Sequence, residues 1–337
     1  MNKPIAVVIL NWNGAKLLEE YLPSVCQYTP EDIADVIVAD NGSTDHSLEV
    51  MRTQFEGVRT IAFPENYGFA DGYNRAIEQL AHYRYIVLLN SDVAVTAGWL
   101  QPLYQYAEEH PEVAALQPKI KAYRDRTAFE YAGAAGGYLD CNGFPYCRGR
   151  IFDSVEQDQG QYDDVCEVAW ASGAALFVRT EVYRKVGGLD SLFFAHMEEI
   201  DLCWRMRLAG YRIMAVPQGE VYHYGGASLD SSSPRKLYLN YRNNLLMMYK
   251  NLPADIRSWR IFRRMIYDGV SAVKYLVSGQ WSFVKAVWDA HFDYRKMKQH
   301  YHTHPAENRL NDLPQGRINI VLDYFLRGKK RYTDVMR

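Results

Sequence analysis

Three acidic side chains within four residues, Glu198, Glu199 and Asp201, are the strongest candidates for chemistry in this sequence. Helical spacing puts Glu198 and Asp201 on one face, with Glu199 about 100° further around the helix from Glu198. Acids that open a helix also suit its positive dipole end, which is the purely structural alternative. Apolar residues on both sides indicate partial burial, and carboxylates are seldom buried without a task. The cluster therefore indicates a functional site.

Polar residues also end the apolar runs of the first hundred residues, which alternate with helical patterns. This alternation predicts a parallel sheet with right-handed crossovers, and such sheets bind ligands beyond the carboxyl ends of their strands. Asn11, Asp40 and Asp92 should then share one rim. Each alone is compatible with a turn or a helix cap, but together they indicate a binding site. The predicted strands are 5–10, 36–39, 59–63 and 85–89, and one helix is predicted at 70–81.

Two common nucleotide-binding motifs are missing. The turn after the first predicted strand reads Asn11-Trp12-Asn13-Gly14 in place of GxGxxG, and no GxxxxGK[ST] sequence occurs. Ordinary NAD-binding and P-loop chemistry are therefore disfavoured. A nucleotide bound here would need its diphosphate neutralised in another way, and a divalent cation held by carboxylate oxygens is the expected substitute.

The rest of the chain divides into a loop-like part and a basic part. Residues 123–165 are rich in Gly, Tyr, Asp and Gln and predict an insertion or mobile loop with at most short strands. An apolar strand with small residues is predicted at 168–178, where a ligand can approach the backbone closely. Beyond residue 234 the pattern is helical, with 20 Lys and Arg against 8 Asp and Glu over 235–337. That balance favours contact with an anionic membrane surface, with packing on the rest of the protein as the alternative.

Composition limits the class of protein. The chain has 337 residues, 48% hydrophobic and 23% charged, with a net charge of -2, which is typical of a globular protein. No apolar run reaches the length of a membrane span, and the start lacks a signal-peptide pattern, so we expect a cytoplasmic protein. The five cysteines form no CxxC pair and are expected to be reduced thiols.

Several motifs, in this order, resemble glycosyltransferase family 2 and, within it, the rhamnosyltransferase-like enzymes. The resemblance covers about residues 4–250 and implies a GT-A fold, an inverting mechanism, a nucleotide-diphosphate sugar donor and a divalent metal, Mn or Mg. The motifs are residues 7–14 (VVILNWNG), 38–45 (VADNGSTD), 65–74 (ENYGFADGYN), 88–92 (LLNSD), 187–190 (GGLD), 198–205 (EEIDLCWR) and 221–228 (VYHYGGAS).

The resemblance also implies roles for individual residues. Glu199 takes the place of the general base, with Glu198 and Asp201 as alternatives, and Asp92 and His223 are the implied metal ligands. The implied nucleotide-sugar site consists of Leu10, Asn11, Asp40, Asn66, Gly68, Asn74, Ser91 and Asp92. Trp170, Gly173, Arg205 and Arg242 are expected on the acceptor side.

Two positions depart from the family pattern. Glu199 stands where the family usually carries Asp, which moves the carboxylate by one methylene, on the order of 1 Å, in a site that depends on geometry. Asn90 and Ser91 precede Asp92, so the first acid of the family's DXD motif is missing. Fewer anionic ligands should weaken metal binding, unless the donor phosphates and His223 compensate.

These observations predict an α/β protein with a GT-A, Rossmann-like, mostly parallel sheet flanked by helices and a C-terminal helical extension. The expected division is a catalytic domain at 1–233, with a nucleotide-binding half at 1–122 and an acceptor-side half at 123–233, followed by a basic helical region at 234–337. The expected activity is transfer of a sugar, such as rhamnose or another deoxyhexose, to a glycan or lipid-linked acceptor, with peripheral membrane contact and no nucleic-acid partner. A sugar nucleotidyltransferase and a non-catalytic nucleotide or glycan binder are the alternatives.

Overall fold

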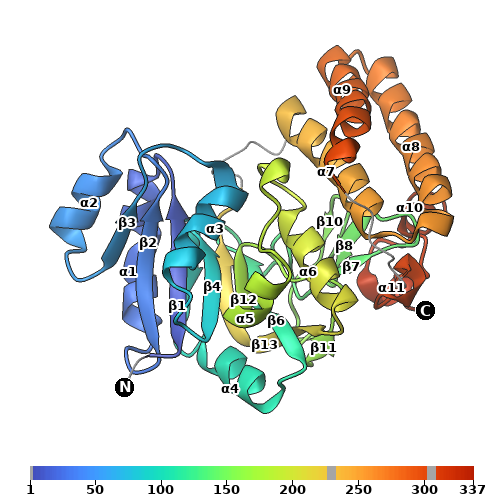
Figure 1. Cartoon of the computed structure of the whole chain (residues 1–337). Helices are drawn as coiled ribbons and strands as arrows, with labels where there is room; N and C mark the ends of the chain where they lie inside the picture. Colours follow the sequence, from blue (N-terminus) through green and yellow to red (C-terminus); the bar gives the residue numbers. More distant parts are fainter. Residues whose placement is uncertain (1–2, 226–232, 302–308) are drawn as a thin grey trace.

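The structure is a computed structural model that describes residues 3–225, 233–301 and 309–337. Within these residues the central sheet has nine strands, in the order β11-β13-β6-β12-β4-β1-β2-β3, with β5 beside β13 (Figure 1). Strands β3, β2, β1 and β4 are parallel neighbours, whereas β12 runs antiparallel to β4 and β6. Helices cover the sheet, so the predicted α/β fold with a mostly parallel sheet is confirmed.

The first hundred residues form the alternating strands and helices that their sequence predicts. All residues of β1 except Leu10 are buried, as expected for a parallel strand covered on both faces. The helix expected at 70–81 begins and ends two residues earlier. The elements are β1 (Ile5–Asn11), α1 (Ala15–Tyr28), β2 (Ala34–Asp40), α2 (Ser47–Gln54), β3 (Arg59–Ala62), α3 (Gly68–Gln79) and β4 (Tyr85–Asn90).

The second part of the sheet carries the acidic cluster on a helix. The expected strand at 168–178 is only partly right, since β12 covers Ala175–Arg179. Residues before it leave the sheet because the Trp170 ring packs directly on Gly137, where a Cβ atom would lie 2.0 Å from the ring. The elements here are β5 (Val93–Val95), α4 (Gln101–Glu109), β6 (Val113–Ala122), β11 (Cys166–Glu167), β12, α5 (Thr180–Lys185), η1 (Ser191–Phe193), α6 (Glu198–Leu208) and β13 (Arg212–His223).

Residues 123–165 form a small antiparallel sheet, ordered β10-β9-β8-β7. Its strands have two or three residues each, as the sequence predicts, but the segment is packed and contributes Tyr138 and Tyr146 to the buried core. The strands are β7 (Gly137–Leu139), β8 (Pro145–Cys147), β9 (Arg150–Ile151) and β10 (Ser154–Val155).

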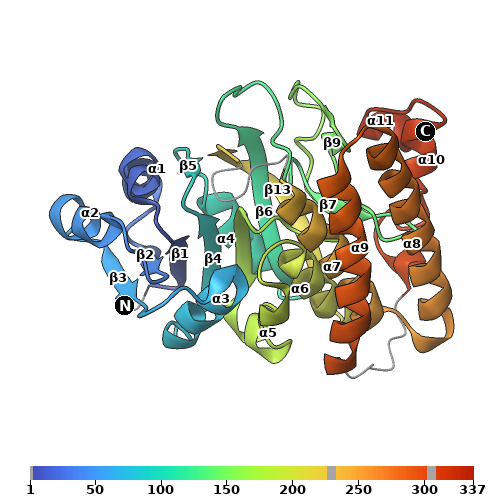
Figure 2. The same cartoon turned by 90° about the horizontal axis from the view of Figure 1, so that it is seen from above.

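The C-terminal residues form a layer of helices beside this small sheet. In both Figure 1 and Figure 2, α8 lies at the edge of the molecule farthest from α2, and α7 lies between α6 and α9 in Figure 2. After the layer, the chain returns to the small sheet, where Tyr332 stacks on Tyr138 and the Ile320 amide donates to Asp140. The elements are α7 (Pro234–Asn251), α8 (Ala254–Val277), α9 (Trp281–Met297), η2 (Lys298–His300), η3 (Leu310–Asp312), α10 (Ile320–Phe325) and α11 (Tyr332–Val335).

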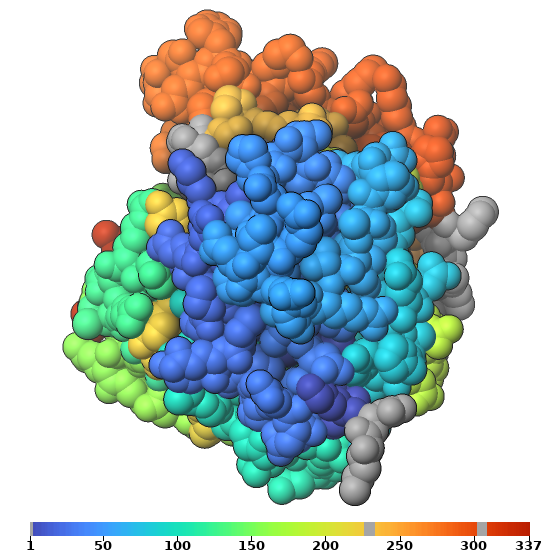
Figure 3. Space-filling view, turned by 90° about the vertical axis from the view of Figure 1, so that its left-hand side faces the viewer, coloured from blue at the N-terminus to red at the C-terminus, as the bar shows by residue number. Residues whose placement is uncertain are grey.

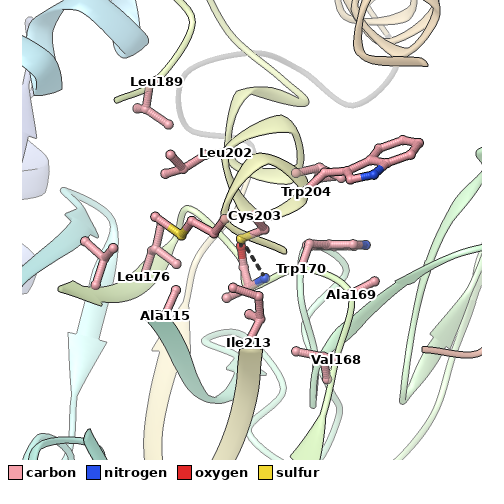
Figure 4. Packing of buried hydrophobic residues seen from close by; sticks show 14 of the residues in the cluster. Ala115, Val168, Ala169, Trp170, Leu176, Leu189, Leu202, Cys203, Trp204 and Ile213 are labelled. Atoms are coloured by element: carbon pink, nitrogen blue, oxygen red, sulfur yellow. Dashed lines mark hydrogen bonds between the residues drawn. The ribbon is translucent and has the colours of Figure 1, made fainter. Parts of the chain in front are cut away.

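Buried hydrophobic residues form two clusters along the sheet, and the larger one reaches α6. Figure 4 shows Leu202, Cys203 and Trp204 of α6 in this packing, with the Cys203 sulfur accepting a hydrogen bond from the Ala171 amide (3.4 Å). In the space-filling view, the first 120 or so residues form one continuous side of the molecule, with the helices of the C-terminal layer above them (Figure 3). The division at residue 233 stays a prediction. Among the described residues, no helix is both long and apolar enough to cross a membrane.

Candidate active site

One edge of the central sheet collects polar residues from distant parts of the chain. Because β1, β2 and β4 are parallel, Asn11, Asp40 and Asn90 end at this edge. Strands β6 and β13 point the same way, since β6 is related to β4 through antiparallel β12 and β13 is parallel to β6. His223, the last residue of β13, therefore reaches the same rim, which is where such sheets bind ligands.

Asp40 is 1% exposed and is held from two directions. One carboxylate oxygen accepts a hydrogen bond from the Asn11 side chain and the other from the Ser43 amide, both at 2.9 Å. The side-chain oxygen of Asn11, Oδ1, is buried without a hydrogen-bond partner, close to the backbone of Gly14. An unpaired buried acceptor is costly, so this rim offers a hydrogen-bond position for a ligand donor.

Residues 66 and 68 lie together, whereas residue 74 is engaged elsewhere. The Asn66 carbonyl oxygen accepts from the Gly68 amide (2.8 Å) and from the Asn41 side chain (3.0 Å). Asn74 instead bonds both the amide and the carbonyl of Leu189 and so ties α3 to the loop before η1. The structure therefore brings Asn66 and Gly68 to the rim near Asp40, and it gives the Asn74 side chain a structural task.

Asp92 and His223 are 131 residues apart and in contact. His223 Nε2 lies 3.1 Å from Asp92 Oδ1, and the Asn90 side chain is 3.4 Å from the same nitrogen. Glu130, which the sequence analysis missed, places a carboxylate oxygen 3.4 Å from His223 Nδ1. Asp92, His223 and Glu130 are all buried. Burial opposes a charge on the imidazole, but Glu130 and Asp92 outweigh it and raise the pKa of His223 to about 10.

This pair has the chemistry of a partial cation site. Two ligands at right angles on a cation with bonds of about 2.1 Å are separated by about 3.0 Å, close to the 3.1 Å between Asp92 Oδ1 and His223 Nε2. Glu130 stands behind the other ring nitrogen, as the orienting carboxylate of a metal-bound histidine does. In the described part of the chain, no three His, Cys, Asp or Glu side chains are grouped to hold a metal ion. The residues therefore fit a cation that displaces the proton from His223 Nε2 and takes its remaining ligands from water and phosphate.

The three acids of α6 have different surroundings. Asp201 accepts hydrogen bonds from Arg205 (2.8 Å), Lys250 (2.9 Å) and Asn251 (2.8 Å). Burial opposes its charge, but Arg205 and Lys250 outweigh burial and hold the pKa of Asp201 below its usual value. Asp201 is therefore fully engaged in a buried ion-pair cluster.

Glu198 and Glu199 each leave one buried carboxylate oxygen without a hydrogen bond. Burial raises the pKa of Glu199 to about 7, and burial together with the neighbouring Glu199 charge raises the pKa of Glu198 well above its usual value. Of the two carboxyl groups, Glu198 is therefore the more readily protonated. Glu198 is 4% exposed whereas Glu199 is only half-buried, so Glu199 is both the more ionised and the more accessible of the two.

Glu199 belongs to the same rim as Asp92. A Cβ atom on Gly173 would lie 3.6 Å from the Glu199 Cβ, so the two residues are packed side by side. The next residue, Ala174, accepts a hydrogen bond from the Asn90 amide at 3.0 Å. A short path of direct contacts thus joins the candidate base to the end of β4, two residues before Asp92.

Comparison with known proteins agrees with this geometry. Residues 6–167 match the family model for glycosyl transferase family 2. An N-acetylglucosaminyl-diphospho-decaprenol L-rhamnosyltransferase of Mycobacterium tuberculosis is 27% identical over 293 residues, which cover 81% of this chain and 92% of that protein. The expected resemblance to glycosyl transferase family 2 is therefore confirmed. The resemblance to its rhamnosyltransferase-like enzymes is confirmed as well.

Solved structures of glycosyltransferases share the fold of this chain. S. aureus TarS in complex with UDP-GlcNAc has a TM-score of 0.56 at 16% identity and covers 86% of this chain and 80% of that one. Mannosyltransferase PcManGT from Pyrobaculum calidifontis, in complex with GDP-Man and Mn²⁺, has a TM-score of 0.53 at 15% identity and covers 88% of each chain. These likenesses confirm the expected GT-A fold.

The residues expected on the acceptor side have different surroundings. Gly173 contacts Glu199, as described. Trp170 is buried and donates its indole N–H to the Tyr138 carbonyl (2.9 Å). Arg205 uses all three guanidinium nitrogens on Asp201 and on two carbonyls of the loop 186–188. Trp170 and Arg205 thus support the structure around α6, and Gly173 is the one that adjoins the candidate base.

Arg242, on α7, reaches the loop that leads into the acidic cluster. It donates to the carbonyls of Leu192 and Phe193. Its neighbour Asn243 donates its amide N–H groups to the carbonyls of residues 193, 195 and 196, at 2.8–3.0 Å. Residues 194, 196 and 197 of this loop have positive φ angles of 66–72° although none is glycine. Such conformations cost on the order of 1–3 kcal/mol each, so the Arg242 and Asn243 contacts must offset that strain.

Sequence reasoning missed two residues of this site, Asn41 and Glu130. Asn41 lies within a quoted motif but had no role, and Asn243 was expected with Arg242 as an Arg-Asn pair near the donor or acceptor, also without a defined role. Glu130 lies in the segment that read as a loop, and only the fold brings it to His223. Residues 226–228, the end of the last motif, lie outside the described residues.

We predict that Asn243→Ala slows sugar transfer while leaving donor affinity unchanged. The carbonyl of Phe193 keeps Arg242 as a donor, but the carbonyls of residues 195 and 196 lose Asn243, at about 1–3 kcal/mol each when buried and unsatisfied, so the loop no longer fixes Glu199. We expect kcat to fall at least about tenfold, given that misplacement of a base by 1 Å has effects of this order or larger. Steady-state kinetics measures the change.

The matched control is Asn240→Ala on the same helix, because the Asn240 side chain donates only to the carbonyl of Lys236, one turn earlier. Its kcat should match the parent protein. Equal kcat values for the parent and Asn243→Ala would contradict a positioning role, and thermal unfolding of both variants separates lost positioning from lost folding.

Proposed function

We propose that this family 2 glycosyltransferase is an inverting enzyme that uses a nucleotide-diphosphate sugar, a divalent cation and a carboxylate base. The observation that carries the proposal is the common rim, where the accessible and ionisable Glu199 adjoins the end of β4 and Asp92 meets His223. The donor's nucleoside would contact Asp40, Asn11 and the backbone near Leu10, with Asn66 and Gly68 beside it.

In the proposed reaction Glu199 takes the proton of the acceptor hydroxyl. The hydroxyl oxygen forms a bond to the anomeric carbon as the bond from that carbon to the phosphate oxygen breaks. The nucleoside diphosphate leaves with the electron pair, and in-line attack inverts the configuration. Asp92 and His223 would hold the cation, whose contribution is to offset negative charge on the diphosphate. Burial and the neighbouring Glu199 raise the pKa of Glu198, which disfavours a second negative charge beside Glu199.

The proposed donor sugar is rhamnose or another deoxyhexose, and the proposed acceptor is a glycan or lipid-linked hydroxyl. This part rests on the rhamnosyltransferase of M. tuberculosis, whose name specifies a diphospho-decaprenol acceptor. We propose a cytoplasmic protein that contacts the inner face of the cell membrane through its basic C-terminal helices. The acidic first 234 residues, with 18 Lys and Arg against 32 Asp and Glu, disfavour nucleic acid as a partner.

We predict that Glu199→Gln abolishes turnover but retains donor binding. Loss of a general base typically costs about 10²–10⁴ in rate. Glu198→Gln is the matched comparison: Glu198 is buried and its pKa is raised well above its usual value, so a neutral side chain there should change turnover little. Transfer assays and donor titrations on the two variants give the answer. Retained turnover in Glu199→Gln would move the base to Glu198 or Asp201.

The pH dependence should follow the ionisation of Glu199. Only the ionised carboxylate accepts a proton, and burial raises its pKa to about 7. The rate of transfer should therefore rise between pH 6 and 8 and fall away in acid, instead of staying level down to the usual Glu value of about 4.3. A kcat that is constant from about pH 5 to pH 8 would show that Glu199 is not the base.

Thermal unfolding with a panel of nucleotide-diphosphate sugars, with and without Mn²⁺, tests the donor and the cation together. A ligand that binds only the folded state raises the unfolding temperature. We predict a Mn²⁺-dependent rise for the parent protein, lost in Asp92→Ala and kept in Glu181→Ala, an exposed acid on α5. The same Mn²⁺-dependent rise in Asp92→Ala would contradict its role as a ligand.

The product released on slow donor hydrolysis distinguishes the alternatives. Nucleoside diphosphate with free sugar supports glycosyl transfer, whereas nucleoside monophosphate with sugar 1-phosphate would support a sugar nucleotidyltransferase. Donor binding without any turnover would support a non-catalytic binder.

A further inference from the structure

Helix α8 exposes a continuous apolar stripe. Six large apolar side chains recur every three or four residues over five turns, so they lie within an arc of about 80° on one face of the helix. Each of these six side chains is at least half exposed, with exposed fractions between 50% and 84%. The opposite face, with Ile261, Arg264 and Asp268, is buried against the rest of the protein. The stripe consists of Trp259, Phe262, Ile266, Val270, Val273 and Val277.

The following helix adds aromatic side chains to this region. Trp281, Trp288 and Phe292 of α9 are 51–75% exposed. Of the twenty large hydrophobic side chains exposed among the described residues, twelve lie between residues 259 and 326. Folded proteins rarely leave this much apolar surface in water unless it contacts something else. Figures 1 and 2 both place α8 at the outer edge of the molecule, where no other element covers it.

Positive charge borders the stripe. Over α8 and α9 the sequence has eight Lys and Arg against four Asp. Each of the four aspartates is engaged, by Arg309, Arg264, Lys285 and the Tyr238 hydroxyl. Six of these cations form no ion pair within the described part of the chain: Arg257 and Arg260, which donate to backbone carbonyls, and Arg263, Lys274, Arg295 and Lys296. On α8, Arg263 and Lys274 fall about 60° and 80° from the centre of the stripe, just outside its border.

We infer that the stripe on α8, together with the aromatic residues of α9, docks on an anionic lipid bilayer, with the apolar side chains inserted between the headgroups. Large apolar residues on one face, bordered by Lys and Arg, characterise helices that lie in the membrane interface. Tryptophan, here near both ends of α8, favours that same depth. A second copy of the chain is the competing occupant, but it would bring the same uncompensated cations against one another, whereas an anionic surface neutralises them.

This inference deepens the proposed function, since it names the surface where a lipid-linked acceptor would be met. Helix α7 packs on both α8 and α9, and its Arg242 and Asn243 hold the loop before Glu199. Docking through α8 would therefore fix the position of the candidate base relative to the bilayer. Vesicle binding needs neither donor nor acceptor, so it can be tested even if the proposed reaction is wrong.

The test is co-sedimentation of the whole protein with vesicles of phosphatidylcholine containing phosphatidylglycerol, and with phosphatidylcholine alone. We expect binding to the anionic vesicles, weakened by 0.5 M salt because salt screens the charges. The triple variant Ile266→Ser, Val270→Ser, Val273→Ser should lower the partition coefficient at least about tenfold, since each of these substitutions removes buried apolar area at the interface. Arg263→Gln with Lys274→Gln should weaken the preference for anionic vesicles, since other unpaired cations of α8 and α9 remain.

The matched control replaces three exposed apolar residues outside these helices: Leu48→Ser, Val155→Ser and Val165→Ser. It should bind vesicles as the parent does, and slow donor hydrolysis in solution should be the same for the parent, the stripe variant and the control. Equal vesicle binding by the stripe variant and the parent would overturn the inference. A parent that is dimeric in light scattering and becomes monomeric in the stripe variant would assign the surface to a second copy instead.

Discussion

The shared direction of five strands is the constraint on which this site depends. Strands β1, β2, β4, β6 and β13 run the same way, so their carboxyl ends meet at one edge although their residues are spread over more than two hundred positions. Strand β12 is antiparallel to these strands and therefore begins at this edge, which places Gly173, just before β12, against Glu199. If β4 and β13 did not run in the same direction, Asp92 and His223 would lie at opposite ends of the sheet. The topology of the sheet, more than any single side chain, therefore determines where the site lies.

Burial then divides the acids of α6 into different tasks. Asp201 has three donors and can stay charged inside the protein, whereas Glu198 and Glu199 have too few donors to remain ionised easily. Buried carboxylates without partners either take up a proton or lose stability. Two adjacent residues thus differ in how readily they are protonated, because only one of them reaches solvent. A base that ionises near neutrality is the kind that general base catalysis favours.

Much of the fold could be read from sequence periodicity, and less of the site. The strands ending at Asn11, Asp40 and Asn90 are short apolar runs between turn residues, so their order and direction followed. The grouping of Asp92 with His223 came from the family resemblance, since nothing local at position 223 indicates its partner. The contact of Glu130 with His223 depends on a short irregular segment beside β6, where the Glu130 amide donates to the Ile120 carbonyl, and this pairing is too short to show periodicity. The strand expected at 168–178 was wrong in its first half because the packing of Trp170 on Gly137 overrides local preference.

The helical layer α7–α9 is attached to the rest of the protein at both ends of its sequence. Arg242 and Asn243 of α7 donate hydrogen bonds to the loop before α6. The segment after the layer contacts the small sheet through Ile320 and Tyr332. A segment fixed at two separated points cannot swing about a single hinge. The layer should thus move as one rigid unit with the rest of the protein, so that a tilt of its outer helix, α8, also tilts the loop before α6.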